Sequence, residues 1–324
     1  MEAKQTRLAW VKDHGANLAA YGGVICCVLL FTILTPIFGE SIWAQRKLET
    51  LMSNVIVTAL MSVGAVFVYS LGNMDISIGK QVGLYATILV VMGNSTGSLV
   101  LPIVVCLVLS VIFAAINGAT GELLHIHPII PSLVVMFVLS GVNSMIFVNL
   151  DTRNISLTSM GHEIFKSPIL MLVVLVAEVL AVSYLFNFTK YGKYARAIGA
   201  NQTAAQQSGV NLVKYKVIAY VIMGVCVVVA SVFQMGYTGA AADATGTGFE
   251  MNVMVALILG GMPLSGGMRS RVSCAVVGAF TFALLDVGLP MIGIAARNTF
   301  IIKAIIFLVV VLITCRKKGG VLPR

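Results

Sequence analysis

The chain has 324 residues, of which 59% are hydrophobic and only 10% are charged. Soluble domains carry charge on roughly a quarter of their residues, so the composition excludes an ordinary soluble protein and indicates an all-α, polytopic membrane protein. The formal net charge of +9 could suggest nucleic acid as a partner. The basic residues instead lie beside apolar runs and are not interleaved with aromatic residues, so we expect membrane lipid, and no nucleic acid, around this charge.

Residues 1–18 form a polar, basic segment in front of the first apolar run. A secretory signal peptide would end in a cleavage site of small residues, and this run has none at its end. We therefore expect residues 1–18 to be a cytoplasmic N-terminus and the first run to be a retained membrane span.

Apolar runs follow one another along residues 19–315, which we interpret as a single transmembrane domain. A helix needs about 20 apolar residues to cross a bilayer, and fewer where it is broken. Two runs, 78–93 and 251–264, are short and adjoin glycine-rich stretches, where irregular backbone is tolerated only inside protein or beside a cavity. Around residues 71–97 a re-entrant hairpin is the alternative. We predict about ten transmembrane helices, at residues 19–38, 51–71, 78–93, 97–118, 129–149, 168–187, 216–236, 251–264, 272–290 and 297–315.

Lysine and arginine residues concentrate in three regions, and such residues favour the cytoplasmic side of a membrane. The regions are the N-terminus, a loop at residues 188–215 and a tail at residues 316–324. Six predicted spans separate the N-terminus from the loop, and four separate the loop from the tail. Because both numbers are even, we predict that both termini and the loop lie in the cytoplasm.

Two glycine-rich segments share a pattern at a constant spacing. Residues 71–79 read LGNMDISIG and residues 259–267 read LGGMPLSGG, so that glycine, methionine and serine positions coincide, beginning with Gly72 and Gly260. Matched glycine interruptions in an internal repeat point to the translocation pathway of a transporter. We therefore predict that the two segments border a pathway; the alternative is a pair of ordinary glycine-rich turns.

The first of these segments contains Asp75, a carboxylate near bilayer depth. Unless it is hydrated or paired, such a charge costs about 2.5–3.5 kcal/mol. Asp75 could fix a broken helix by accepting backbone N–H groups, line the pathway, or face the cytoplasm. Amides within the spans suit recognition of a neutral polar solute, although hydrogen bonds between helices explain a membrane amide equally well. The candidate pathway residues are Asn54, Asp75, Ser77, Asn117, Asn143, Asn252, Ser265 and Gly266.

Three further ionisable residues lie inside predicted spans: Glu178, Asp286 and Lys303. Intramembrane charges indicate function by default, and structural pairing or snorkelling to the interface is the alternative. We interpret each of the three as structural.

The loop at residues 188–215 contains a predicted short helix. Asn201 suits the N-cap, the sequence TAAQQS favours helix, and Gly209 suits the position after the last turn. A helix of about two turns is not stable alone in water, so it must pack on something. It could lie on the membrane surface, but its small, uncharged side chains are better suited to a groove on a partner protein.

The two glycine-rich segments and this loop together resemble the permease subunits of ABC importers for ribose and related monosaccharides. Members of that family typically carry a GGIDLSVG-like segment, then AIGGN-x-x-AA-x-x-SGI, then an LGGTSLSGG-like segment. The counterparts here are LGNMDISIG, AIGANQTAAQQSGV and LGGMPLSGG, in the same order within residues 50–315.

The resemblance implies a type II-like ABC importer permease with broken or short helices, in the bacterial cytoplasmic (inner) membrane. Two permeases, identical copies or paralogues, would form the sugar pathway. A cytoplasmic ABC ATPase would bind ATP and Mg and dock on the loop, and a periplasmic or lipid-anchored sugar-binding protein would dock at residues 150–167 and 237–250. This chain would itself hold no cofactor or metal and perform no catalysis. The implied ATPase-coupling residues are Arg196, Gly199, Asn201, Ala204, Ala205 and Gly209.

Three residues depart from the family pattern: Asn73 replaces a glycine, Lys80 follows the first motif directly, and Pro263 replaces a small polar residue. They leave open which sugar or nucleoside is carried. The chain has no Walker or HEXXH sequence, which disfavours an ATPase or a zinc protease within this chain. The remaining alternatives are a scaffold subunit and an ion-coupled secondary transporter for a small polar solute, although such a carrier usually has ionisable residues on several spans.

Overall fold

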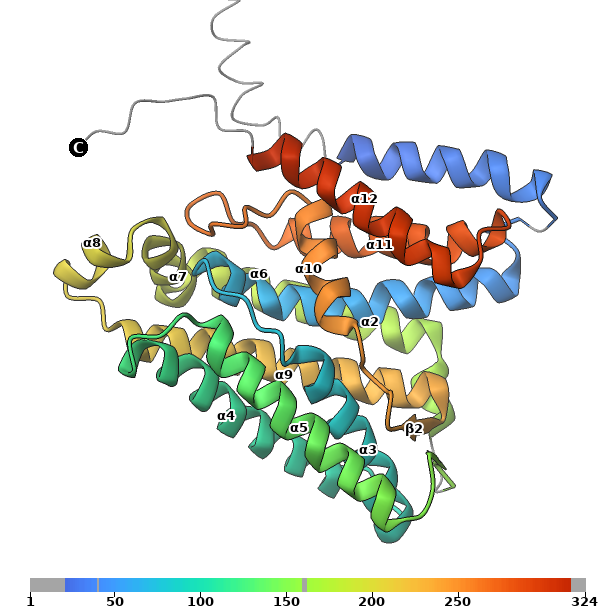
Figure 1. The fold of residues 1–324 in the computed structure, drawn as a ribbon, viewed down its shortest axis with the longest axis horizontal. Helices are drawn as coiled ribbons and strands as arrows, with labels where there is room; N and C mark the ends of the chain where they lie inside the picture. The colour runs from blue at the N-terminus through green and yellow to red at the C-terminus, as the bar shows by residue number, and fades with distance from the viewer. Residues whose placement is uncertain (1–20, 40, 159–161, 316–324) are drawn as a thin grey trace, which may run out of the picture.

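The computed structural model describes residues 21–39, 41–158 and 162–315, and these are almost entirely helical (Figure 1). An apolar helix, Tyr21–Ile37, comes first. The elements that follow are α2 (Gln45–Ser70), α3 (Ile78–Thr96), α4 (Val100–Leu123), α5 (Ile129–Asn149), β1 (Asn154–Ser156), the 3-10 helix η1 (His162–Lys166), α6 (Pro168–Phe188), α7 (Lys190–Ala200), α8 (Gln202–Gln207), α9 (Leu212–Thr238), β2 (Ala240–Ala242), α10 (Phe249–Leu259), α11 (Ser273–Met291) and α12 (Ala296–Cys315).

A helix lies at each of the ten predicted spans. Six of them, α2, α4, α5, α6, α9 and α11, are long and apolar enough to cross a bilayer. This confirms a mostly helical, polytopic membrane protein, while the number of ten crossings stays a prediction. Residues 71–77 form irregular backbone and α3 follows as one continuous helix, so how this stretch enters the membrane stays a prediction.

Helices α2 and α9 form the centre of the molecule, because their apolar residues are buried along most of their length. Figure 1 shows α3, α4 and α5 on one side of this pair, and α11, α12 and the helix Tyr21–Ile37 on the other. Small residues allow the helices to approach closely: a Cβ at Gly64 would lie 2.6 Å from the Cβ of Cys226. The outer helices expose large apolar side chains such as Phe137 and Val173, as lipid contact requires.

The two ends of the helix bundle differ in structure. At one end lie α7, α8 and the loop that follows α10 (Figure 1). At the other end β1 pairs antiparallel with β2, with Ile155 opposite Ala241. The side chain of Asn94 in α3 binds this pair, donating to the Ser156 carbonyl at 2.9 Å and accepting from the Thr158 N–H at 2.8 Å. Residues 154–158 and 240–242 therefore lie side by side at this end.

Candidate translocation and coupling site

The Asp75 carboxyl group organises the break between α2 and α3. It is only 2% exposed. Its Oδ1 atom accepts hydrogen bonds from the Ser77 N–H at 2.7 Å and the Ser77 hydroxyl at 2.5 Å. The hypothesis that Asp75 accepts a backbone N–H group at the break is confirmed, and the alternative of cytoplasmic exposure is wrong.

Helix α4 contributes an amide to the same group. Asn117 Nδ2 donates to Asp75 Oδ2 and to Ser77 Oγ, each at 3.1 Å. Gln81, one turn into α3, donates from Nε2 to Ser77 Oγ at 2.8 Å. Hydrogen bonds to a charged group contribute about 1.5–3 kcal/mol each, so three of them offset much of the cost of burying Asp75. We call Asp75, Ser77, Gln81 and Asn117 the aspartate network.

Sequence reasoning identified three members of this network and missed Gln81. The available signal was its position four residues after Ser77, because residues at i and i+4 share one face of a helix. Gln81 is also almost fully buried, and a buried amide needs polar partners.

The two glycine-rich segments and the end of α7 meet through backbone atoms. The Gly267 N–H donates to the Ser70 carbonyl at 2.8 Å. A Cβ at Gly199 would lie 1.9 Å from that carbonyl oxygen, and a Cβ at Gly266 would lie 2.4 Å from the Gly72 nitrogen. We call Ser70, Gly72, Gly199, Gly266 and Gly267 the glycine junction. It unites Gly199 and Gly266, which sequence reasoning assigned to separate functions.

Helices α2 and α10 end in the same way, with a register that differs from the sequence alignment. The Asn73 N–H donates to the Val68 carbonyl, and the Met262 N–H donates to the Leu257 carbonyl. These are Schellman caps, which place a glycine in the left-handed region directly after the helix. The capping glycines are Gly72, with φ +77°, and Gly261, with φ +88°. The aligned pair of Gly72 and Gly260 is therefore wrong by one residue, because the helix ends fix the equivalence.

The short helix predicted in the loop is confirmed as α8. The Asn201 side chain caps it by accepting the Ala204 N–H at 3.0 Å. Gly209 follows with φ +82° and its N–H donates to the Gln206 carbonyl. Ala205 is buried, whereas Ala204 is exposed, so α8 has one face against the protein and one face free.

Arg196 ties α7 to α6. Its guanidinium donates to the Phe186 carbonyl at 3.2 Å and to the Gly192 carbonyl at 3.3 Å, and it lies 4.9 Å from the centre of the Phe186 ring. These contacts give Arg196 a role inside this chain, in addition to the predicted role in coupling.

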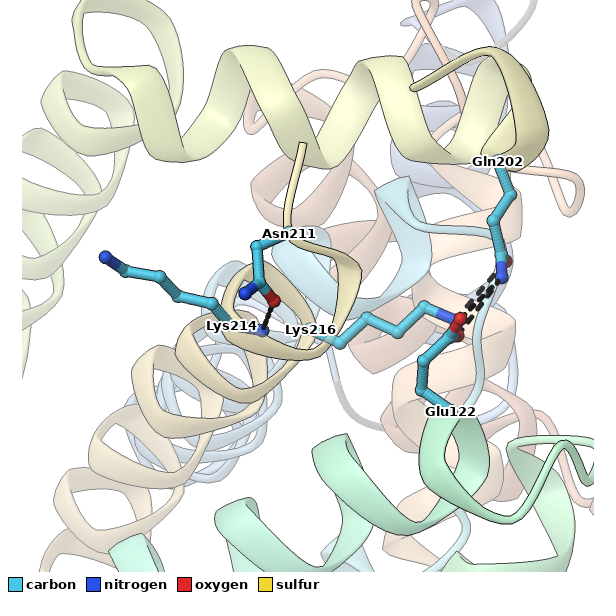
Figure 2. Close-up of polar contacts among 5 residues, drawn as sticks. All are labelled: Glu122, Gln202, Asn211, Lys214 and Lys216. Atoms are coloured by element: carbon cyan, nitrogen blue, oxygen red, sulfur yellow. Dashed lines mark hydrogen bonds and ion pairs between the residues drawn. The ribbon is translucent and has the colours of Figure 1, made fainter. Parts of the chain in front are cut away.

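A polar cluster that was not predicted joins α8 to the membrane helices. Figure 2 shows Lys216 of α9 reaching Glu122 at the end of α4, with Gln202 of α8 beside both. The distance from Lys216 Nζ to Glu122 Oε2 is 2.5 Å. Gln202 Nε2 lies 3.1 and 3.3 Å from the two Glu122 oxygens, and its Oε1 lies 3.3 Å from Lys216 Nζ. We call these three residues the anchor cluster.

The other candidate pathway residues lie outside the aspartate network. Asn143 accepts from Thr87 at 2.7 Å and donates to the Asp243 carboxylate at 3.4 Å, towards the end that carries the strands. Asn54 and Asn252 are half-buried in α2 and α10, and Ser265 is exposed in the loop after α10. The eight candidates therefore divide among several places, with Asp75, Ser77 and Asn117 as the group that forms direct contacts.

The start of α3 packs against the chain segment that leads into α10. A Cβ at Gly79 would lie 2.1 Å from a Glu250 carboxylate oxygen, and Lys80 donates to the Thr247 hydroxyl at 2.9 Å. The predicted structural role of Asp286 agrees with its ion pair to Lys303. Glu178 buries both of its carboxyl oxygens.

Comparison with known proteins places these features in a family. The profile described as "Branched-chain amino acid transport system / permease component" matches residues 47–311, which include both glycine-rich segments, the aspartate network and the anchor cluster. The ribose import permease protein RbsC of Escherichia coli (strain K12) is 26% identical over 322 residues, covering 96% of each chain. MglC of Salmonella typhimurium (strain LT2), a galactose/methyl galactoside import permease protein, is 26% identical and covers 93% of each. RbsC of Bacillus subtilis (strain 168) is 25% identical and covers 94%.

Proposed function

Since this chain belongs to the family of branched-chain amino acid transport system permease components, we propose that it is the membrane permease subunit of an ATP-driven sugar importer. The family description mentions amino acids, but relatives that match over almost their whole length are import permeases for ribose and for galactose or methyl galactoside. Their full-length similarity favours a monosaccharide as the substrate.

The glycine junction is the observation that best supports a transport mechanism. An importer must transmit movement from its ATPase to the substrate pathway. The end of α7, directly before α8, contacts the end of α2 and the loop after α10 through backbone atoms. Close-packed backbone transmits displacement because it has no side chain that could yield. Movement of α7 and α8 would therefore shift both glycine-rich segments together and alternate access to the pathway.

The partners follow from this arrangement. A cytoplasmic ABC ATPase docks on the exposed face of α8, and a second permease, identical or paralogous, completes the pathway. An extracytoplasmic binding protein delivers the sugar to the surface formed around β1 and β2. If all ten predicted spans cross the bilayer, both termini and α7–α8 would lie in the cytoplasm and the paired strands outside.

The intramembrane charges favour ATP as the energy source over an ion gradient. Ion-coupled carriers need ionisable groups that can bind and release ions along the pathway. Here the Asp75 carboxyl group accepts three hydrogen bonds, and Asp286 is paired with Lys303. These two carboxyl groups have partners within the fold, and together with the family match this supports a partner subunit as the source of energy.

Affinity purification of the tagged chain in mild detergent tests the proposal. We expect an ATP-hydrolysing subunit to co-purify, and cells that contain the system to take up radiolabelled ribose or galactose only while ATP is available. Uptake that follows an ion gradient, by a chain purified without any ATPase, would replace the importer with an ion-coupled carrier.

A further inference from the structure

The anchor cluster lies where three helices from distant parts of the sequence meet. Glu122 is in the last turn of α4, Gln202 is the first residue of α8, and Lys216 is near the start of α9. Lys216 is only 5% exposed, whereas Gln202 is exposed on the outer side of the pair. The ion pair is therefore shielded from water and α8 is attached to it from outside.

The positions of the charged residues Glu122 and Lys216 do not stabilise their own helices. The C-terminal end of a helix carries partial negative charge and disfavours a carboxylate, and the N-terminal end disfavours an ammonium group. Glu122 occupies the unfavourable last turn of α4, and Lys216 lies just past the first turn of α9, where the dipole offers it no gain. What the two charges provide is a pair of charge-assisted hydrogen bonds to Gln202, which are roughly twice as strong as neutral ones.

Helix α4 continues from this cluster to the aspartate network. Asn117, which binds Asp75, lies five residues before Glu122 on the same helix, a rise of about 7.5 Å. The backbone of α4 also packs directly on α9, because a Cβ at Gly118 would lie 2.7 Å from Val217 Cα. The cluster, the α4 backbone and Asn117 therefore form one continuous rigid connection from α8 to the break between α2 and α3.

We propose that Glu122, Gln202 and Lys216 are positioning residues that transmit movement of α8 through α4 to the aspartate network. This inference rests on the proposed function, since it needs an ATPase that moves α8. It adds a side-chain route that acts in parallel with the glycine junction. Loss of the cluster should lower the amount of sugar moved per ATP hydrolysed, while the complex still assembles and hydrolyses ATP.

The test uses the whole importer, purified as the complex that co-purifies with this chain and reconstituted into vesicles with its binding protein. ATP hydrolysis and uptake of radiolabelled ribose or galactose are measured in the same vesicles. We expect Gln202→Met to reduce uptake per ATP roughly five-fold or more, the lower range of couplings between distant sites. Because Gln202 is exposed, this variant removes the connection without leaving a cavity.

A charge reversal separates positioning from mere packing. The double variant Glu122→Lys with Lys216→Glu keeps the ion pair and suits the dipole of α4 better. It leaves the Gln202 amide able to donate and accept as before. We expect it to recover most of the coupling that the neutral pair Glu122→Gln with Lys216→Met loses. Lys214→Met is the matched control, because Lys214 is exposed two residues earlier on α9 and points away from the cluster in Figure 2.

Two results would overturn the inference. The first is wild-type uptake per ATP in both Gln202→Met and the neutral pair. The second is loss of complex assembly, measured by size exclusion, in every cluster variant including the charge reversal, which would make the cluster a packing element only. Failure of the proposed function has a different signature, namely wild-type vesicles that move sugar without using ATP.

Discussion

Substitution of Gly199 by alanine tests the backbone contact between α7 and the two glycine-rich segments. Gly199 is a helical residue, and alanine would normally stabilise a helix by up to about 1 kcal/mol relative to glycine. In this structure the added Cβ would lie 1.9 Å from the Ser70 carbonyl oxygen and 2.8 Å from the Gly267 nitrogen. We therefore expect the opposite sign at this position.

The magnitude follows from the displacement that the new carbon requires. Ordinary contact begins at 3.4 Å, so the chain must withdraw by about 1.5 Å, and overpacking of this kind costs about 1–3 kcal/mol. Withdrawal also breaks the hydrogen bond from Gly267 to Ser70, which is worth about 1 kcal/mol. After the gain in helix propensity, which offsets about 1 kcal/mol, we expect Gly199→Ala to be destabilised by about 1–3 kcal/mol.

The assay is thermal unfolding of the purified chain in detergent, followed by uptake in cells. We expect the Tm of Gly199→Ala to fall by roughly 5 °C and uptake to fall with it. Gly141→Ala is the matched control, because Gly141 is a helical glycine with no atom within 4 Å of its added Cβ, so its Tm should stay level or rise. A wild-type Tm and normal uptake in Gly199→Ala would refute the close contact and the transmission of movement built on it.

Three further substitutions follow from the site. In Asp75→Asn, the oxygen that accepts from the Asn117 amide is replaced by a second donor, so we expect the free energy of unfolding to fall by about 1–3 kcal/mol. Thermal unfolding should show this loss, and Asn117→Asp added to it should restore part of the stability. Full stability in Asp75→Asn alone would contradict the aspartate network. Ala204→Asp places an acid in the first turn of α8, where it favours the helix, so the Tm should hold while co-purification of the ATPase is lost. Arg196→Met removes the contacts to Phe186 and should cost about 1–2 kcal/mol, which an unchanged Tm would disprove.

The positions of the ten apolar helices and the caps of α8 could be predicted from the sequence, whereas α7 was not predicted. Apolar runs determine the helices because the bilayer requires apolar surface and internally satisfied backbone. Local chemistry determines α8, since Asn201 and Gly209 act on backbone groups within the same short segment. Such features depend on neighbouring residues, and the sequence shows neighbours directly.

The contacts between distant segments could not be predicted in the same way. Glu122 and Lys216 are 94 residues apart, and neither carries a pattern that indicates the other. At the glycine junction the contacting atoms belong to the backbone, so no side-chain type marks the partner. The one-residue error in aligning the repeat has a related cause: both candidate positions at the end of α10 are glycine, and only backbone hydrogen bonds show that Gly261 is the cap.

Because the glycine junction is made of backbone atoms, specificity for a substrate or for an ATPase must come from other parts of the chain. Peptide groups are chemically the same in every protein, so the glycine junction cannot distinguish one substrate or one ATPase from another. Recognition must therefore reside in separate surfaces; under the proposed function, the exposed residues of α8 would recognise the ATPase. The exposed α8 residues could therefore be exchanged for those of another permease so that the chain binds that permease's ATPase. The glycine junction would be unchanged by this exchange.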